Sequence, residues 1–203
     1  MGTRHLTCVV KDGEYKVAQY GQWDGYPTGQ GVEILEFLTR MNKDIFSEKI
    51  DKLSFLTQEE LDNRWFEFGV IPGSSSVSMS IADEFAKTYP ENSRDTGSRV
   101  LNIIYNSEEP LKLDNNLEFA ADSLFCEWAY VIDLDQNTFE VYEGFNKTPL
   151  SKNERFNFLE YKSRKSYDGG TYYPVKLIVV FSLSDLPSEE EFLNSIPNDD
   201  EEE

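Results

Sequence analysis

The residues best suited to chemistry lie in one short segment, residues 22–31, which reads Gln-Trp-Asp-Gly-Tyr-Pro-Thr-Gly-Gln-Gly. Its three glycines would let the backbone approach a ligand closely, and a helix beginning at Gly31 would offer free N–H groups and a partial positive charge. Trp23 and Tyr26 could stack on a planar ring. This combination favours a small anionic, nucleotide-like ligand.

Arg4 and Asp24 extend this candidate site. Arg4, at the open end of a predicted hairpin, would contact an anionic group, and Asp24 would orient the ligand as a hydrogen-bond acceptor. The alternative is a purely structural turn, in which Asp24 caps the turn and pairs with Arg4 while Trp23 and Tyr26 cover the core. The predicted ligand-binding residues are Arg4, Gln22, Trp23, Asp24, Tyr26, Gly29, Gln30 and Gly31.

Known signatures of phosphate binding and catalysis are incomplete in this chain. The loop lacks the Gly-Lys-Ser/Thr of a P-loop, and Ile34 stands where G-x-G-x-x-G requires its third glycine. The single histidine is His5, and there is no G-x-S-x-G elbow and no C-x-x-C pair. The sequence therefore leaves open whether the protein is an enzyme.

Cysteines and carboxylates give no metal or redox signature. Cys8 and Cys126 lie in apolar runs, which indicates buried, unreactive thiols. Asp133 and Asp135 could bind a metal ion, but the end of a strand and the start of a turn is the more typical interpretation. Glu127 shares a strand face with apolar residues, where an acid either faces solvent or is costly to bury, and we keep it as a further candidate. We predict no metal site and no cofactor.

The segments around the loop show clear secondary-structure patterns. A hairpin is predicted over 6–22 around Asp12-Gly13, a pair that suits a type I′ turn. The segment 172–183 is apolar on both faces, which predicts a central strand. Residues 147–170 are polar and basic, which predicts a long loop. The remaining predicted elements are strands over 125–134 and 138–143 and helices over 32–41, 42–69, 77–87, 96–105 and 188–196.

These elements predict an α+β fold in a single domain spanning residues 1–197. We expect about five mostly antiparallel strands, drawn from both ends of the chain, with the helices of the middle packed on one face. Residues 198–203 carry five acidic side chains and are expected to form a disordered acidic tail.

The chain of 203 residues has a formal charge of −19, which argues against direct nucleic-acid binding through a broad surface. This charge supports an alternative function, an acidic interaction module that binds a basic protein partner or imitates the charge of nucleic acid. It is also compatible with solubility alone. The oligomeric state is left open.

The sequence shows no secretory signal and no membrane-spanning run, and we therefore expect a soluble cytoplasmic protein. The start of the chain leads into a strand-like segment instead of a secretory signal, and the two cysteines suit a reducing compartment. The longest apolar run, residues 177–181, is far shorter than the ~20 residues that span a bilayer. We therefore expect no membrane partner.

The opening Met-Gly-Thr-Arg and the Trp-Asp-Gly-Tyr-Pro block at 23–27 resemble a family of uncharacterised proteins that share both motifs. The strand over 125–134 is similar to a later strand of that family. The resemblance implies a shared fold and a shared site around Arg4 and Asp24, but no reaction. Some members have histidine where this chain has Gln22.

Overall fold

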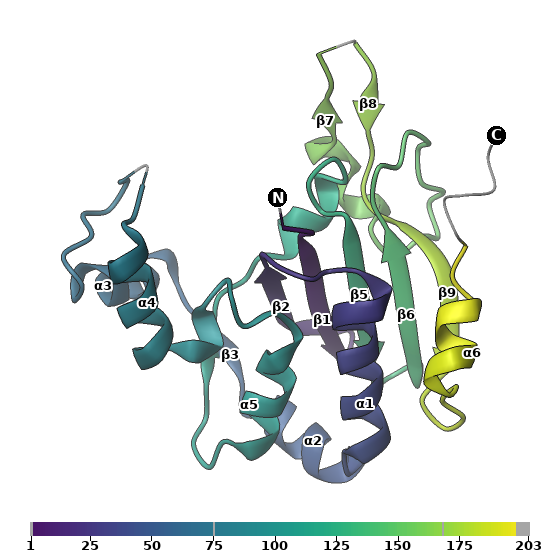
Figure 1. Cartoon of the computed structure of the whole chain (residues 1–203), viewed down its shortest axis with the longest axis horizontal. Helices are drawn as coiled ribbons and strands as arrows, with labels where there is room; N and C mark the ends of the chain where they lie inside the picture. The colour runs from purple at the N-terminus through teal and green to yellow at the C-terminus, as the bar shows by residue number, and fades with distance from the viewer. Residues whose placement is uncertain (1, 75, 168, 198–203) are drawn as a thin grey trace.

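The computed structural model describes residues 2–74, 76–167 and 169–197, and the predicted acidic tail at 198–203 lies outside them. Its centre is a five-stranded sheet in the order β2-β1-β5-β6-β9 (Figure 1). β1 pairs in parallel with β5, and the other three pairings are antiparallel. The predicted α+β fold is therefore confirmed. The strands are β1 (His5–Lys11), β2 (Glu14–Gly21), β5 (Trp128–Asp133), β6 (Thr138–Glu143) and β9 (Lys176–Ser182).

The turn between β1 and β2 has the conformation that its sequence predicts. Asp12 and Gly13 both have positive φ, at 55° and 72°, as a type I′ turn requires. Their backbone N–H groups donate to the carboxylate of Asp135 at 2.9 and 2.8 Å, which joins this turn to the one that follows β5.

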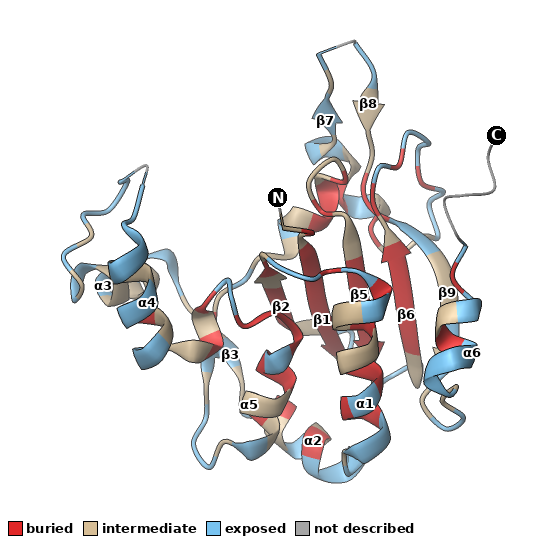
Figure 2. Ribbon diagram, in the orientation of Figure 1, coloured by how far each residue is buried: buried red, intermediate tan, exposed pale blue. Residues whose placement is uncertain are grey.

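Four helices cover one face of the sheet: α1 (Val32–Arg40), α2 (Lys43–Ile50), α5 (Val100–Asn106) and α6 (Glu189–Asn194). Their apolar side chains pack against alternate residues of the strands, and the buried positions concentrate on β1, β5 and β6 (Figure 2). No helix in the described part of the chain is long and apolar enough to cross a membrane.

The opposite face of the sheet is covered by short 3-10 helices, η4 (Leu117–Ala121) and η5 (Asn157–Lys162). The loop predicted at 147–170 is therefore only partly a loop, because Phe156 and Leu159 are buried against the sheet. It also contains β7 (Arg164–Lys165), which pairs with β8 (Thr171–Tyr172). Cys8 and Cys126 are buried in this second core, where burial raises the pKa of both thiols.

The strand predicted to be central is at the edge of the sheet. β9 pairs with β6 alone within the five-stranded sheet, and Val180 is 47% exposed. A run of β-branched apolar residues gives high strand propensity at any position, so it does not distinguish a central strand from an edge strand.

The helix predicted over 42–69 is interrupted by β3 (Ser54–Phe55), which pairs in parallel with β4 (Lys112–Leu113). Beyond β3, α3 (Gln58–Phe66) begins with the predicted capping box, in which Thr57 and Glu60 satisfy each other's backbone N–H groups. α3 and α4 (Met79–Thr88) form an arm that stands apart from the sheet (Figure 1).

Candidate functional site

The glycine-rich loop, residues 22–31, is bonded along its length to a second segment, residues 93–99, which we call the arginine segment. The Gln22 N–H donates to the carbonyl of Arg94 at 2.9 Å, and the Trp23 indole N–H donates to the carboxylate of Asp95 at 2.7 Å. Gln30 Oε1 accepts the N–H of Ser98 at 2.8 Å. Hydrogen bonds thus hold these two segments, which are distant in sequence, together at the N-terminal end of α1.

A cavity of about 440 Å³, the loop cavity, lies between these two segments. Four of the eight predicted ligand-binding residues line it, and five residues outside that prediction complete its wall. Tyr26, Gly29 and Gly31 shape the loop without lining the cavity, and Arg4 lies elsewhere. The lining residues are Gln22, Trp23, Asp24, Gln30, Glu33, Arg94, Asp95, Gly97 and Arg99.

The backbone N–H groups that the sequence predicted to be free for a ligand are instead hydrogen-bonded within the glycine-rich loop. Residues 27–31 form a π-helical turn, η1 (Pro27–Gly31), ahead of α1. The N–H groups of Gly29 and Gly31 donate to the Tyr26 carbonyl, and that of Gln30 donates to the Asp24 carbonyl. The prediction of free N–H groups at Gly31 is therefore wrong, because the loop satisfies them internally.

Glycine is needed within this turn for steric reasons. A Cβ atom on Gly29 would lie 2.4 Å from the carbonyl oxygen of Asp24, which itself has a positive φ of 55°. The Tyr130 hydroxyl, fully buried on β5, donates to the Gly25 carbonyl at 2.8 Å. The loop is thus held in one shape by the sheet beneath it.

Arg4 has a structural position outside the loop cavity. Its guanidinium lies 4.4 Å from the centre of the Phe125 ring, and its Nε is 3.9 Å from Glu127 Oε1. The same carboxylate oxygen accepts the Arg4 backbone N–H at 3.2 Å. The pairing of Arg4 with Asp24 that the structural-turn alternative predicted is replaced by this pairing with Glu127, which the structure places just before β5 and not within the strand.

The loop cavity contains both signs of charge. Arg94 and Arg99 supply two positive charges, while Asp24, Glu33 and Asp95 supply three negative ones. Arg99 is oriented by the arginine segment itself, since its guanidinium donates to two backbone carbonyls there. Mixed charges and a half-exposed indole suit a ligand with an anionic group and hydrogen-bond donors better than a highly charged polyanion.

His5 lies directly behind the loop cavity. Gly21 and Gly25 leave space for its side chain, since a Cβ atom on either would lie 2.0 or 2.9 Å from it. Gly97 also lies against the ring and has a positive φ of 53°. Burial lowers the pKa of His5 to about 3, an effect that the Gln30 side chain partly opposes. The Gln30 side chain is a polar neighbour of the ring, although neither ring nitrogen has a contact of full hydrogen-bond geometry among the described residues. The imidazole is therefore costly to charge where it lies.

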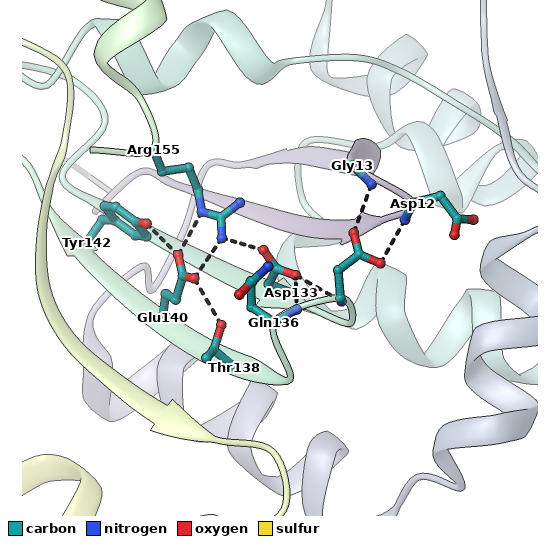
Figure 3. Close-up of polar contacts among 9 residues, drawn as sticks. Asp12, Gly13, Asp133, Gln136, Thr138, Glu140, Tyr142 and Arg155 are labelled. Atoms are coloured by element: carbon teal, nitrogen blue, oxygen red, sulfur yellow. Dashed lines mark hydrogen bonds and ion pairs between the residues drawn. The ribbon is translucent and has the colours of Figure 1, made fainter. Parts of the chain in front are cut away.

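A second polar cluster on the other face of the sheet is structural. Arg155 donates to Asp133 at 2.5 Å and to both carboxylate oxygens of Glu140 at 2.7 Å, and the Tyr142 hydroxyl donates to Glu140 (Figure 3). Asp133 also accepts the N–H groups of residues 135 and 136, as expected of a carboxylate that ends a strand and starts a turn. Burial and the Glu140 carboxylate raise the pKa of Tyr142.

The structure therefore favours the turn interpretation of Asp133 and Asp135 over a metal pair. Within residues 2–74, 76–167 and 169–197, no group of three or more His, Cys, Asp or Glu side chains is placed to hold a metal ion.

The arginine segment is absent from the predicted site, although Arg94 and Arg99 flank a glycine there. The helix predicted over 96–105 is confirmed as η3 (Gly97–Arg99) followed by α5, whereas residues 93–95 precede it outside any helix. Comparisons with protein-family models, with curated proteins and with solved structures give no match. The family resemblance thus stays a prediction.

Proposed function

We propose that the protein binds a small ligand in the loop cavity, and that this ligand joins one anionic group to a planar, hydrogen-bonding group, as a nucleoside monophosphate does. The main support is the cavity itself: about 440 Å³ in volume, it lies at the predicted loop and falls in the roughly 300–1,000 Å³ range of small-molecule sites. Its polar groups converge from the glycine-rich loop, from the arginine segment that is hydrogen-bonded to it, and from Glu33 at the start of α1.

Arg94 and Arg99 take the role of anion contact that the sequence assigned to Arg4. The side chain of Arg94 is 58% exposed, and its one ion pair with a described residue is a long contact of 3.9 Å to Asp95, so its guanidinium is open to a ligand on this part of the surface. Bidentate guanidinium donors match the oxygens of phosphate or carboxylate groups.

Trp23 supplies the surface for the planar group. Trp23 is 49% exposed, and its indole N–H donates to the carboxylate of Asp95, which restrains the ring. A restrained and accessible aromatic face is suited to stacking at low entropic cost. The carboxylates of Asp24 and Glu33 would then accept hydrogen bonds from amino or hydroxyl groups of the ligand.

A thermal-shift screen with nucleoside monophosphates tests this proposal, using the wild type, Arg94→Gln and the control Arg40→Gln. Arg40 is an exposed arginine at the end of α1, and like Arg94 it lies outside both cores. A nucleotide at about 100 times its Kd adds roughly 2.7 kcal/mol, which raises the Tm of a chain of this size by about 5–10 °C.

We expect this rise in the wild type and in Arg40→Gln, and its loss or marked reduction in Arg94→Gln. Equal rises in all three proteins would place the bound nucleotide elsewhere. No rise with any nucleoside monophosphate at millimolar concentration would overturn the proposal.

A further inference from the structure

The α3–α4 arm exposes apolar side chains. Phe66, Ile71 and Met79 are 63%, 68% and 80% exposed, and all three lie on or between these two helices. Large apolar residues exposed on one part of a folded protein commonly mark a surface that binds another macromolecule, and of these three residues Met79 lines the groove described next. This part of the molecule stands apart from the sheet and its two cores (Figures 1 and 2).

A groove of about 690 Å³, the arm groove, runs between this arm and the body of the protein. Its apolar surface comes from Leu61 and Trp65 of α3 and from Met79 and Phe85 of α4, with Trp23 on the opposite side. Trp65 and Phe85 stack with their ring centres 3.7 Å apart and their planes 6° from parallel. This stacking gives the groove a preformed aromatic base.

Charge is distributed unevenly around the arm groove. Asp83, Asp95 and Asp114 lie along it, and Arg94 is the only basic residue among those that line it in the described part of the chain. The chain as a whole has a formal charge of −19, so its long-range field is also negative. A segment that carries lysine or arginine next to a large apolar side chain would therefore be complementary both to the groove and to the long-range field.

We propose that the arm groove is a docking site for a basic segment of a partner protein, with one large apolar side chain of that segment seated against Trp65 and Met79. This interaction goes beyond the small-ligand site, because most of the residues that line the arm groove are not part of the loop cavity. A second copy of this chain is a poorer occupant, since two chains with the same negative charge repel each other. In such an interface the buried apolar side chain provides most of the affinity, and the surrounding charges set the association rate and the specificity.

The test uses two fluorescein-labelled probe peptides, Lys-Arg-Leu-Phe-Arg-Lys and its control Lys-Arg-Ser-Ser-Arg-Lys, with binding followed by fluorescence anisotropy. The charge variant is Asp83→Lys on α4, and its matched control is Glu48→Lys, an exposed acid on α2. The apolar variant is Met79→Gln, matched by Ile45→Gln, an exposed apolar residue on α2. Circular dichroism verifies that each variant is folded.

We expect the Leu-Phe peptide to bind at least about fivefold more tightly than the Ser-Ser peptide, with an affinity that falls as salt is raised. Asp83→Lys and Met79→Gln should each weaken it by about fivefold or more, while Glu48→Lys and Ile45→Gln change it by less than about twofold.

Equal binding of the two peptides, or equal losses in Asp83→Lys and Glu48→Lys, would mean that only the overall charge attracts them and would overturn the proposal. Absence of binding would do the same. Dimerisation of the wild type that Met79→Gln abolishes, measured by light scattering, would assign the groove to a second copy instead.

Discussion

At the scale of single residues, His5 is a fully buried imidazole beside the candidate site. It sits in β1 opposite Gly21, edge-on to Tyr130 at 6.4 Å, and the nearby Gly97 belongs to the wall of the loop cavity. The backbone of Gly97 therefore separates the imidazole from any ligand in that cavity. The imidazole is neutral because burial lowers its pKa by more than the Gln30 side chain raises it.

This burial predicts a pH dependence of stability. The pKa of His5 is about 3 in the folded chain, against an ordinary value of 6.5, so only the unfolded chain gains a proton when the pH falls below about 6.5. Above that pH the imidazole is neutral in both states, so its titration does not change the free energy of unfolding. Between about pH 6.5 and pH 3 that free energy falls by up to roughly 1.4 kcal/mol per pH unit.

Urea unfolding at pH 7 and pH 5 measures this effect. We expect the free energy of unfolding to fall by about 2 kcal/mol in the wild type and by clearly less in His5→Gln. Because His5 is the only histidine, its Cε1–H signal in the NMR spectrum should also stay constant from about pH 8 to pH 4. A midpoint near 6.5 in that titration would contradict the buried, neutral imidazole.

At the scale of elements, the ion pairs of Arg155 attach the segment before η5 to the sheet. Asp133 ends β5 and Glu140 lies in β6, and their side chains are only 4% and 9% exposed. Removing the guanidinium would leave two buried carboxylates without their cation, which is far more costly than the loss of a surface pair.

Arg155→Met is therefore expected to lower the free energy of unfolding by about 3–5 kcal/mol. Lys16→Met, which removes an ion pair with the exposed Glu14, should change it little. Chemical denaturation of both variants provides the comparison. A similar small loss in both would show that the Arg155 cluster has no special structural role.

Local signals account for the elements that were predicted correctly. Asp12-Gly13 specifies its own turn through positive φ, and Thr57 with Glu60 specifies the start of α3 through reciprocal hydrogen bonds. The position of β9 at the edge and the parallel pairing of β1 with β5 depend on contacts between distant segments. Those contacts cannot be predicted from the local sequence pattern of β1, β5 or β9.

At the scale of the whole molecule, the same distinction explains the candidate site. The glycine-rich loop is visible in the sequence because its glycines and aromatic residues are adjacent there. Its cations are not, because Arg94 reaches the loop only after the chain has passed through the α3–α4 arm, whereas Arg4 is close in sequence but turns toward Glu127.

The loop cavity and the arm groove share one wall, which consists of Trp23, Arg94 and Asp95. If both proposals hold, the negative charge of the chain favours a ligand of low net charge in the loop cavity and a basic segment in the arm groove. The chain has three tryptophans, and their positions differ: Trp23 lines both sites, Trp65 lines only the arm groove, and Trp128 packs against the core.

The indole N–H signals of these three tryptophans, followed in a ¹H–¹⁵N spectrum during titration with a nucleoside monophosphate, test the small-ligand site most directly. We expect the Trp23 signal to shift in a saturable manner, because its indole N–H is bonded to Asp95 in the cavity wall, while the Trp65 and Trp128 signals stay in place. An unmoved Trp23 signal at millimolar nucleotide, or a shift confined to Trp65 or Trp128, would contradict ligand binding in the loop cavity.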